Sequence, residues 1–157
     1  MNARVDATNY IKTGLGRAML NLQREVDSSG LERSLVELVK IRVSQINGCS
    51  YCIDMHTKDA RARGETEQRI YLLNAWRETS FFSERERAAL EWAEAVTLVG
   101  DTHVPDEVFE RVRQQFTEPE IVALTFALVA INGWNRLAIS FRIPAGSYQA
   151  AAASASA

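Results

Sequence analysis

The sequence predicts an all-α fold of six or seven helices, and three observations support this. Apolar residues recur every three or four positions in successive segments, which is the period of a helix with one buried face. Two capping-box patterns, Ser83-Glu-Arg-Glu86 and Thr117-Glu-Pro-Glu120, mark helix starts. We find no stretch of useful length that alternates apolar and polar residues as a β-strand does. The chain is therefore expected to form one helical domain.

The first half of the chain is divided by turn and cap signals. Asp27-Ser-Ser-Gly30 and Asn47-Gly48 are typical of turns, and Gly64 suits a helix C-cap. Gly16 weakens the interior of the first segment. The predicted helices are Thr8–Val26, Leu31–Ile46 and Cys49–Arg63.

The second half contains four further predicted helices and a tail. The helices are one from Thr66 through Trp76, one from Ser83 to Gly100, one after Pro105 that ends near Phe116, and one from Thr117 to about Phe141. The last is the most apolar and has few polar residues before Asn132, so we expect it in the core or at a subunit interface. The domain is assigned to residues 1–143. Residues 144–157 are rich in Ala and Ser without periodicity and are expected to be disordered.

Composition excludes several classes of function. At 157 residues, with 46% hydrophobic and 24% charged residues, the chain suits a globular protein with a sizeable core. The net charge of −2 does not favour a nucleic-acid partner. The N-terminus lacks an apolar signal segment, and the longest apolar run, Ile121–Ile131, is eleven residues, too short for a bilayer. We therefore expect a cytoplasmic protein without a membrane partner.

Both cysteines and one of the two histidines fall in one short stretch. Cys49 and Cys52 are three residues apart and His56 follows four later, so a helix places all three on one face. Cys49 is expected at the helix N-terminus, where free N–H groups stabilise a thiolate. In the cytosol such a pair is more often catalytic or metal-binding than a structural disulfide. We also expect Cys49 to be the more exposed cysteine.

Less reactive interpretations of the same residues exist. The two cysteines can be buried apolar residues of a helix face. Cys49, Cys52 and His56 can also ligate zinc, but structural zinc sites usually take two ligand pairs from separate segments, so no metal is predicted. His56 one turn after Cys52 is placed to act as a general base. Glu37, judged from sequence physics alone, is a solvated residue that pairs with Arg33 or Lys40.

A family resemblance follows from the spacing of these residues. Glu37, eleven intervening residues, Cys49-Ser-Tyr-Cys52 and His56 resemble the core signature of the AhpD-like alkylhydroperoxidases of the carboxymuconolactone decarboxylase superfamily. Val43-Ser-Gln-Ile-Asn-Gly48 and Ile131-Asn-Gly-Trp-Asn-Arg136 also resemble that family. The resemblance covers roughly residues 15–142.

The resemblance implies a function and a set of roles. It implies a helical trimer or hexamer that reduces hydroperoxides, with Cys52 as the peroxidatic cysteine and Cys49 as the resolving one. Glu37 and His56 would form the proton relay. It implies no bound cofactor but an external thiol reductant, which in some members is a dihydrolipoyl carrier. Tyr51 stands where the best-characterised members have a relay histidine. The alternative is a non-catalytic redox-sensing or thiol–disulfide exchange module. Decarboxylation is not expected, since the decarboxylase branch lacks the cysteine pair.

Overall fold

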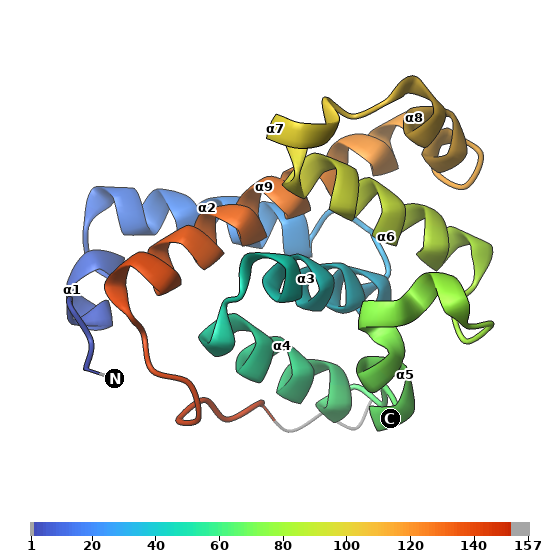
Figure 1. The fold of residues 1–157 in the computed structure, drawn as a ribbon. Helices are drawn as coiled ribbons and strands as arrows, with labels where there is room; N and C mark the ends of the chain where they lie inside the picture. Colours follow the sequence, from blue (N-terminus) through green and yellow to red (C-terminus); the bar gives the residue numbers. More distant parts are fainter. Residues whose placement is uncertain (1, 152–157) are drawn as a thin grey trace, which may run out of the picture.

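The computed structural model describes residues 2–151, and in this range all regular secondary structure is helical (Figure 1). The all-α prediction is therefore confirmed, although the described residues contain more helices than the six or seven expected. The elements are α1 (Ala7–Ile11), α2 (Gly14–Asp27), α3 (Arg33–Asn47), α4 (Ser50–Ala62), α5 (Glu67–Leu72), the 3₁₀ helix η1 (Leu73–Glu78), α6 (Glu84–Thr97), α7 (Val99–Thr102), α8 (Asp106–Arg113) and α9 (Glu118–Phe141).

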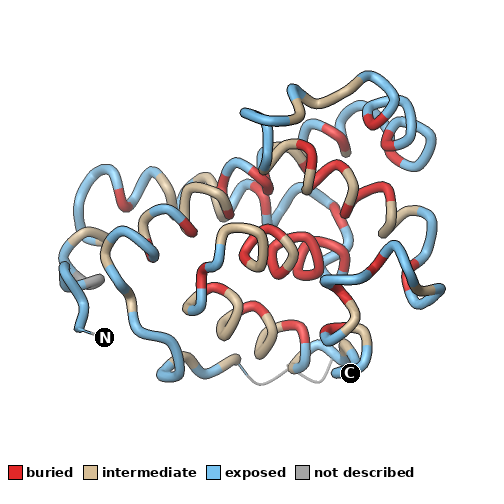
Figure 2. Tube along the Cα trace, viewed as in Figure 1, coloured by how far each residue is buried: buried red, intermediate tan, exposed pale blue. Residues whose placement is uncertain are grey.

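Helix α3 lies at the centre of the fold. It packs against α4, α6 and α9, while α2 runs along α9 and α8 packs against α6 (Figure 1). Figure 2 shows buried residues concentrated on α3 and on the sides of α4, α6 and α9 that face it. Helix α3 is buried along much of its length, and its buried residues include the polar Glu37, Lys40 and Ser44 as well as apolar side chains, so its neighbours cover more than one face of it.

Two apolar clusters lie on opposite sides of α3. The larger joins Val39 and Val43 to residues of α6, α8 and α9, and it includes both cysteines. The smaller joins Leu38 and Ile41 to Leu73 and neighbouring residues of α4, η1 and α6. Because the catalytic candidates are on α3 and α4, both clusters fix the site through the same central helix.

Local capping signals set several helix ends as predicted. At the start of α6 the Ser83 hydroxyl accepts a hydrogen bond from the Glu86 N–H, and the Glu86 carboxylate accepts one from the Ser83 N–H. Thr117 and Glu120 form the corresponding capping box at the start of α9. Gly48 ends α3 with a left-handed φ of 70°, a conformation that glycine adopts without strain. The α3–α4 turn is therefore encoded by its own residues.

Three predicted helices are broken. The first divides into α1 and α2 because the Thr13 hydroxyl accepts a hydrogen bond from the Gly16 N–H and caps a new start. Gly16 is required there, since a Cβ would lie 2.2 Å from the Tyr10 carbonyl oxygen. The helix from Thr66 tightens into η1 at Leu73, and that from Ser83 ends at Thr97 before α7.

Part of the segment expected to be disordered makes defined contacts with α4. The Gly146 N–H donates to Asp54 (3.0 Å), the Lys58 ammonium donates to the Tyr148 carbonyl (3.0 Å), and the Tyr148 hydroxyl donates to Asp59 (2.8 Å). Residues 144–151 thus lie along the helix that carries Cys52 and His56. The rest of the expected tail, 152–157, lies outside the described residues.

Helix α9 is long and apolar enough, by length and a mean hydropathy of 1.4, to cross a membrane. The uninterrupted apolar run of eleven residues is only the middle of this helix, whose predicted bounds, Thr117 to about Phe141, agree with the structure. One side of α9 supplies Leu124, Leu128 and Ile131 to the core, which is the usual role of such a helix in a globular domain.

Candidate active site

The two cysteines lie at the start of α4 and are joined in a disulfide with Cα atoms 5.4 Å apart. Cys49 is the N-cap residue, and its sulfur accepts a hydrogen bond from the Cys52 N–H at 3.3 Å. Each residue is only 1% exposed. The expectation that Cys49 is the more exposed cysteine is therefore wrong, because the last turn of α9 and the segment after it cover the start of α4.

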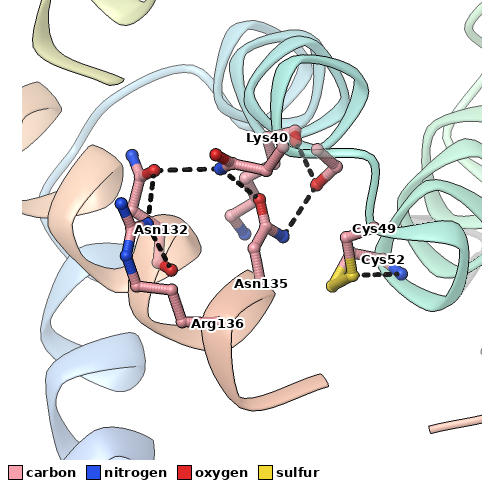
Figure 3. The surroundings of a disulfide bond; sticks show 8 residues. Lys40, Cys49, Cys52, Asn132, Asn135 and Arg136 are labelled. Atoms are coloured by element: carbon pink, nitrogen blue, oxygen red, sulfur yellow. Dashed lines mark hydrogen bonds between the residues drawn. A yellow bond between two sulfur atoms is a disulfide. The ribbon is translucent and has the colours of Figure 1, made fainter. Parts of the chain in front are cut away.

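A buried polar network fixes the turn that precedes Cys49 (Figure 3). The Asn47 amide donates to Asn132 and Asn135, each at 2.9 Å. Asn135, fully buried, donates in turn to the Ser44 hydroxyl at 3.1 Å, and Ser44 donates to the Lys40 carbonyl. Because buried polar groups are costly when unpaired, this network holds α9 and the end of α3 in one arrangement.

Sequence reasoning gave no role to this network. Its signal was present, since Asn132 and Asn135 are three residues apart in a predominantly apolar helix. Two amides on one face of such a helix indicate a polar partner across the core.

Glu37 and His56 meet in the interior. Glu37 comes from α3 and His56 from α4, each is 6% exposed, and His56 Nδ1 lies 2.9 Å from Glu37 Oε2. The other carboxylate oxygen is 3.4 Å from both the Lys40 ammonium and the Arg63 guanidinium. Glu37 does contact Lys40, but it is not the solvated residue that sequence physics alone favoured.

The charge of Glu37 follows from these contacts. Burial by itself raises the pKa of the Glu37 carboxyl, but the hydrogen bond from His56 and the charges of Lys40 and Arg63 outweigh burial. Its pKa therefore lies below the ordinary value, and the group is an anion at neutral pH. An anion only accepts hydrogen bonds, so Nδ1 of His56 carries the proton and Nε2 is the basic nitrogen.

Cys52, Glu37 and His56 all line one cavity of about 430 Å³. Its walls are largely apolar and aromatic, with Tyr10, Tyr51 and Trp134 among them, and Lys40, Asp59 and Arg63 add charge. Cys49 does not line this cavity. Three of the four predicted site residues, Glu37, Cys52 and His56, therefore line one cavity. The fourth, Cys49, is outside the lining and is joined to Cys52 by the disulfide.

One cluster in the described part of the chain has the spacing of a cation site. Ligand atoms of Glu37, His56 and Asp59 lie within 4.8 Å of one another, and the cysteines do not join them. Lys40 and Arg63 already balance Glu37, and the Tyr148 hydroxyl donates to Asp59. The donors of this cluster therefore fit an internal ion-pair network better than a cation.

Comparison with known proteins gives a consistent picture. The sequence profile of the carboxymuconolactone decarboxylase family matches residues 14–95. The uncharacterized protein YdfG of Bacillus subtilis is 46% identical over 140 residues, which are 89% of this chain and 95% of YdfG.

Two solved structures share the fold. One is ATU0492 of Agrobacterium tumefaciens, a protein of unknown function suggested to be an AhpD antioxidant defence protein. It superposes with a TM-score of 0.87 at 43% identity, over 94% of this chain and 100% of that one. An uncharacterized peroxidase-related protein from Silicibacter sp. TM1040 shares the fold alone, with a TM-score of 0.74 at 22% identity over 83% and 70% of the two chains. The chain belongs to the carboxymuconolactone decarboxylase family and, within it, is AhpD-like.

Proposed function

We propose that the protein is a cysteine peroxidase that reduces hydroperoxides through a Cys49–Cys52 disulfide cycle. The observation that carries the proposal is the shared cavity: Cys52 lines it together with a buried Glu37–His56 pair whose atoms are 2.9 Å apart. A carboxylate that fixes a histidine beside a cysteine is the arrangement that produces a reactive thiolate. Family membership supports the same chemistry.

In the reduced protein, His56 Nε2 takes the proton of the Cys52 thiol, and Glu37 stabilises the imidazolium through Nδ1. The Cys52 thiolate attacks a peroxide oxygen and breaks the O–O bond. The alcohol leaves with the proton from His56, and Cys52 becomes a sulfenic acid. The Cys49 thiolate then attacks the Cys52 sulfur and expels hydroxide, which takes up a proton to become water, and the disulfide forms. An external thiol reduces it.

Position along α4 favours Cys52 as the attacking residue. At 1.5 Å rise per residue, His56 is about 6 Å along the axis from Cys52 but about 10.5 Å from Cys49. The hydrogen bond from the Cys52 N–H favours a thiolate on Cys49, which suits the second step, when Cys49 attacks the sulfenic acid.

The assignment is tested with Cys49→Ser, Cys52→Ser and a sulfenic-acid trapping reagent under hydrogen peroxide or cumene hydroperoxide. We expect a trapped sulfenate at Cys52 in the first variant and loss of peroxide consumption in the second. A sulfenate that accumulates at Cys49 at the wild-type rate in the second variant would reverse the roles.

The alternative is a thiol–disulfide exchange or redox-sensing module. It predicts that the disulfide exchanges with added dithiol while the protein adds nothing to the rate at which the dithiol alone consumes peroxide. Peroxide turnover with excess dithiol separates the two functions. Turnover at the rate of the dithiol alone would favour the exchange module.

A further inference from the structure

We propose that the cavity that Cys52 lines selects organic hydroperoxides that carry a carboxylate at the end of an aliphatic chain, and that Arg33 binds this carboxylate. The inference rests on the proposed peroxidase and names the class of its substrate. The reacting step stays that of the proposed cycle, and the carboxylate takes no part in it.

The Cys52 cavity is much larger than hydrogen peroxide needs. Its volume of about 430 Å³ falls in the range of pockets that hold drug-sized ligands, about 300–1,000 Å³. A molecule of two oxygen atoms would leave most of this space to water beside apolar walls, which is unfavourable. The volume therefore favours a substrate with an apolar body.

The cavity is also elongated, because its lining follows one face of α4 along the whole helix. On α4 the lining runs from Cys52 past His56 to Arg63, the residue that follows the last helical one. At 1.5 Å rise per residue, Cys52 and Arg63 are about 16.5 Å apart along the axis. An extended chain fits such a space better than a compact ring.

Arg33 lies toward the end of the cavity that is remote from Cys52. Helices α3 and α4 lie side by side (Figure 1), and Arg63, after the end of α4, is 3.4 Å from Glu37 in the first half of α3. Arg33 is one helical turn before Glu37, about 6 Å along the axis, on the same face of α3. Because the short α3–α4 turn places Cys52 at the other end of this helix pair, a ligand that reaches from Cys52 to Arg33 spans the cavity.

Arg33 is the charged side chain of the cavity that lacks a partner within the described residues. The other charged side chains of the lining each contact an oppositely charged or polar group; they are Asp27, Glu37, Lys40, Asp59 and Arg63. Arg33 makes no hydrogen bond or ion pair with another residue between 2 and 151. A carboxylate matches such a guanidinium, with which it can form two parallel hydrogen bonds.

The exposure of the two ends fixes the direction in which such a ligand enters. Cys52 is 1% exposed, whereas Arg33 is an exposed residue. Burial of a carboxylate in the interior is costly, so the charged end stays beside Arg33 in contact with water. The uncharged chain passes apolar wall residues such as Val36 and Met55 and brings the hydroperoxide to Cys52.

The first test measures binding without peroxide. Decanoate and decanol, which differ in the charge of the head group, are titrated calorimetrically into the disulfide form of the protein. We expect decanoate to bind about 10-fold more tightly than decanol, and Arg33→Gln to lose that factor, as one charge-assisted hydrogen-bonded pair would provide. Arg33→Lys, which keeps the charge, should retain most of the affinity for decanoate.

Arg113→Gln is the matched control. It removes the same charge from an exposed residue at the end of α8, outside the lining of the cavity, and should bind decanoate as the wild type does. Helix content by circular dichroism verifies each variant. Equal affinity of decanoate for the wild type and Arg33→Gln, or equal losses in Arg33→Gln and Arg113→Gln, would overturn the proposal.

The second test locates the ligand. In reduced Cys49→Ser protein, Cys52 is the remaining cysteine of the chain, and its alkylation by iodoacetamide is followed with and without decanoate. Saturating decanoate should slow the alkylation several-fold, and the same concentration should protect much less when Arg33→Gln is added. Alkylation of Cys52 at an unchanged rate would place decanoate elsewhere and overturn the proposal.

The third test uses the reaction. The hydroperoxides of linoleic acid and of its methyl ester share the chain and differ in the charge of the head group. Arg33→Gln is expected to raise KM for the acid about 10-fold, with kcat for the acid and both constants for the ester within about 2-fold of the wild type. Because Arg33 is exposed, the preference of the wild type for the acid should also weaken as NaCl is raised.

The outcomes for the two proposals are separable. A ratio of acid to ester turnover that is the same in the wild type and Arg33→Gln would contradict selection by Arg33. Since the decanoate tests contain no peroxide, absence of peroxide turnover would refute the proposed peroxidase, and the carboxylate site would be decided by calorimetry and alkylation.

Discussion

Replacing Glu37 with glutamine separates its proposed relay function from a structural one. The substitution keeps the size of the side chain and removes the charge that faces His56 at 2.9 Å and Lys40 at 3.4 Å. Since Glu37 and Lys40 are both buried, a loss of stability is expected as well. A hydrogen bond to a charged group contributes about 1.5–3 kcal/mol, and we expect the free energy of unfolding to fall by about that amount.

The catalytic effect is expected to be separate and large. Without an anion on Nδ1, the imidazolium that forms at His56 is less stable, and general acid–base steps contribute about 10²-fold or more to a rate. We expect the rate of disulfide formation with cumene hydroperoxide to fall about 10²-fold, which corresponds to about 2.7 kcal/mol of activation free energy. Because the pKa of Glu37 lies below its ordinary value, the carboxylate is already ionised above about pH 5, and no part of the deficit should follow the titration of Glu37 above that pH.

Glu94→Gln is the matched control. Glu94 is also largely buried, accepts from Arg42 at 2.7 Å and from the Trp76 indole at 2.9 Å, and does not line the Cys52 cavity. Burial raises the pKa of the Glu94 carboxyl, but hydrogen bonds from Arg77, Trp76 and Arg42 outweigh burial, so the pKa lies below its ordinary value. Glu94→Gln should lose comparable stability and keep its rate. Equal rates for the two variants, measured well below their melting temperatures, would refute the relay and leave Glu37 a structural residue.

Three further predictions concern assembly and stability. Light scattering at micromolar concentration should give a trimer or hexamer, and Phe126→Glu, in the half-exposed stripe that it forms with Val122 and Val129 on α9, should shift it toward the 17.6 kDa monomer; a wild-type monomer would contradict this. Asn135→Ala should cost about 2–4 kcal/mol in urea unfolding, since it removes two hydrogen bonds of a fully buried side chain and leaves a cavity; a cost below about 1 kcal/mol would contradict a structural role of the network. Hydrogen bonds from the Thr117 N–H, Arg85 and the Thr117 hydroxyl lower the pKa of Glu120 to about 2. Its contribution should therefore be full above about pH 4.5 and lost as pH falls toward 2, so wild-type and Glu120→Gln unfolding curves should converge in that window; a constant difference would exclude this linkage.

Local signals in the sequence were enough for most of the fold. Capping boxes at Ser83 and Thr117 act over three residues, and the Gly48 turn needs only its own backbone, so these features were predicted and are confirmed. The break before α2 was missed because Gly16 was interpreted only as a residue that weakens a helix. In the structure, Gly16 is needed because a Cβ at this position would clash with the Tyr10 carbonyl oxygen.

The candidate site also has some features that local sequence predicts and others that depend on how the helices pack. The helical spacing of Cys49, Cys52 and His56 placed them together on α4, because spacing within one helix is local information. The burial of Glu37 and the covering of Cys49 depend on α4 and α9 packing against α3, which no window of the sequence contains. Physical reasoning on Glu37 alone therefore favoured a solvated residue, and only the family resemblance placed it in the site.

The bonds from Asn47 to Asn132 and Asn135 have a consequence for the order in which the chain folds. The α3–α4 turn can form from a short stretch of sequence, but the Asn47–Asn135 bond closes a separation of 88 residues. Closing long loops is slow and costs chain entropy, so α9 docks late. A newly made chain would thus hold both thiols at an uncovered helix start until its last helix arrives. If the two thiols were oxidised in that interval, the disulfide would form before α9 covers the start of α4. Synthesis in a reducing environment therefore favours folding before the cysteines react.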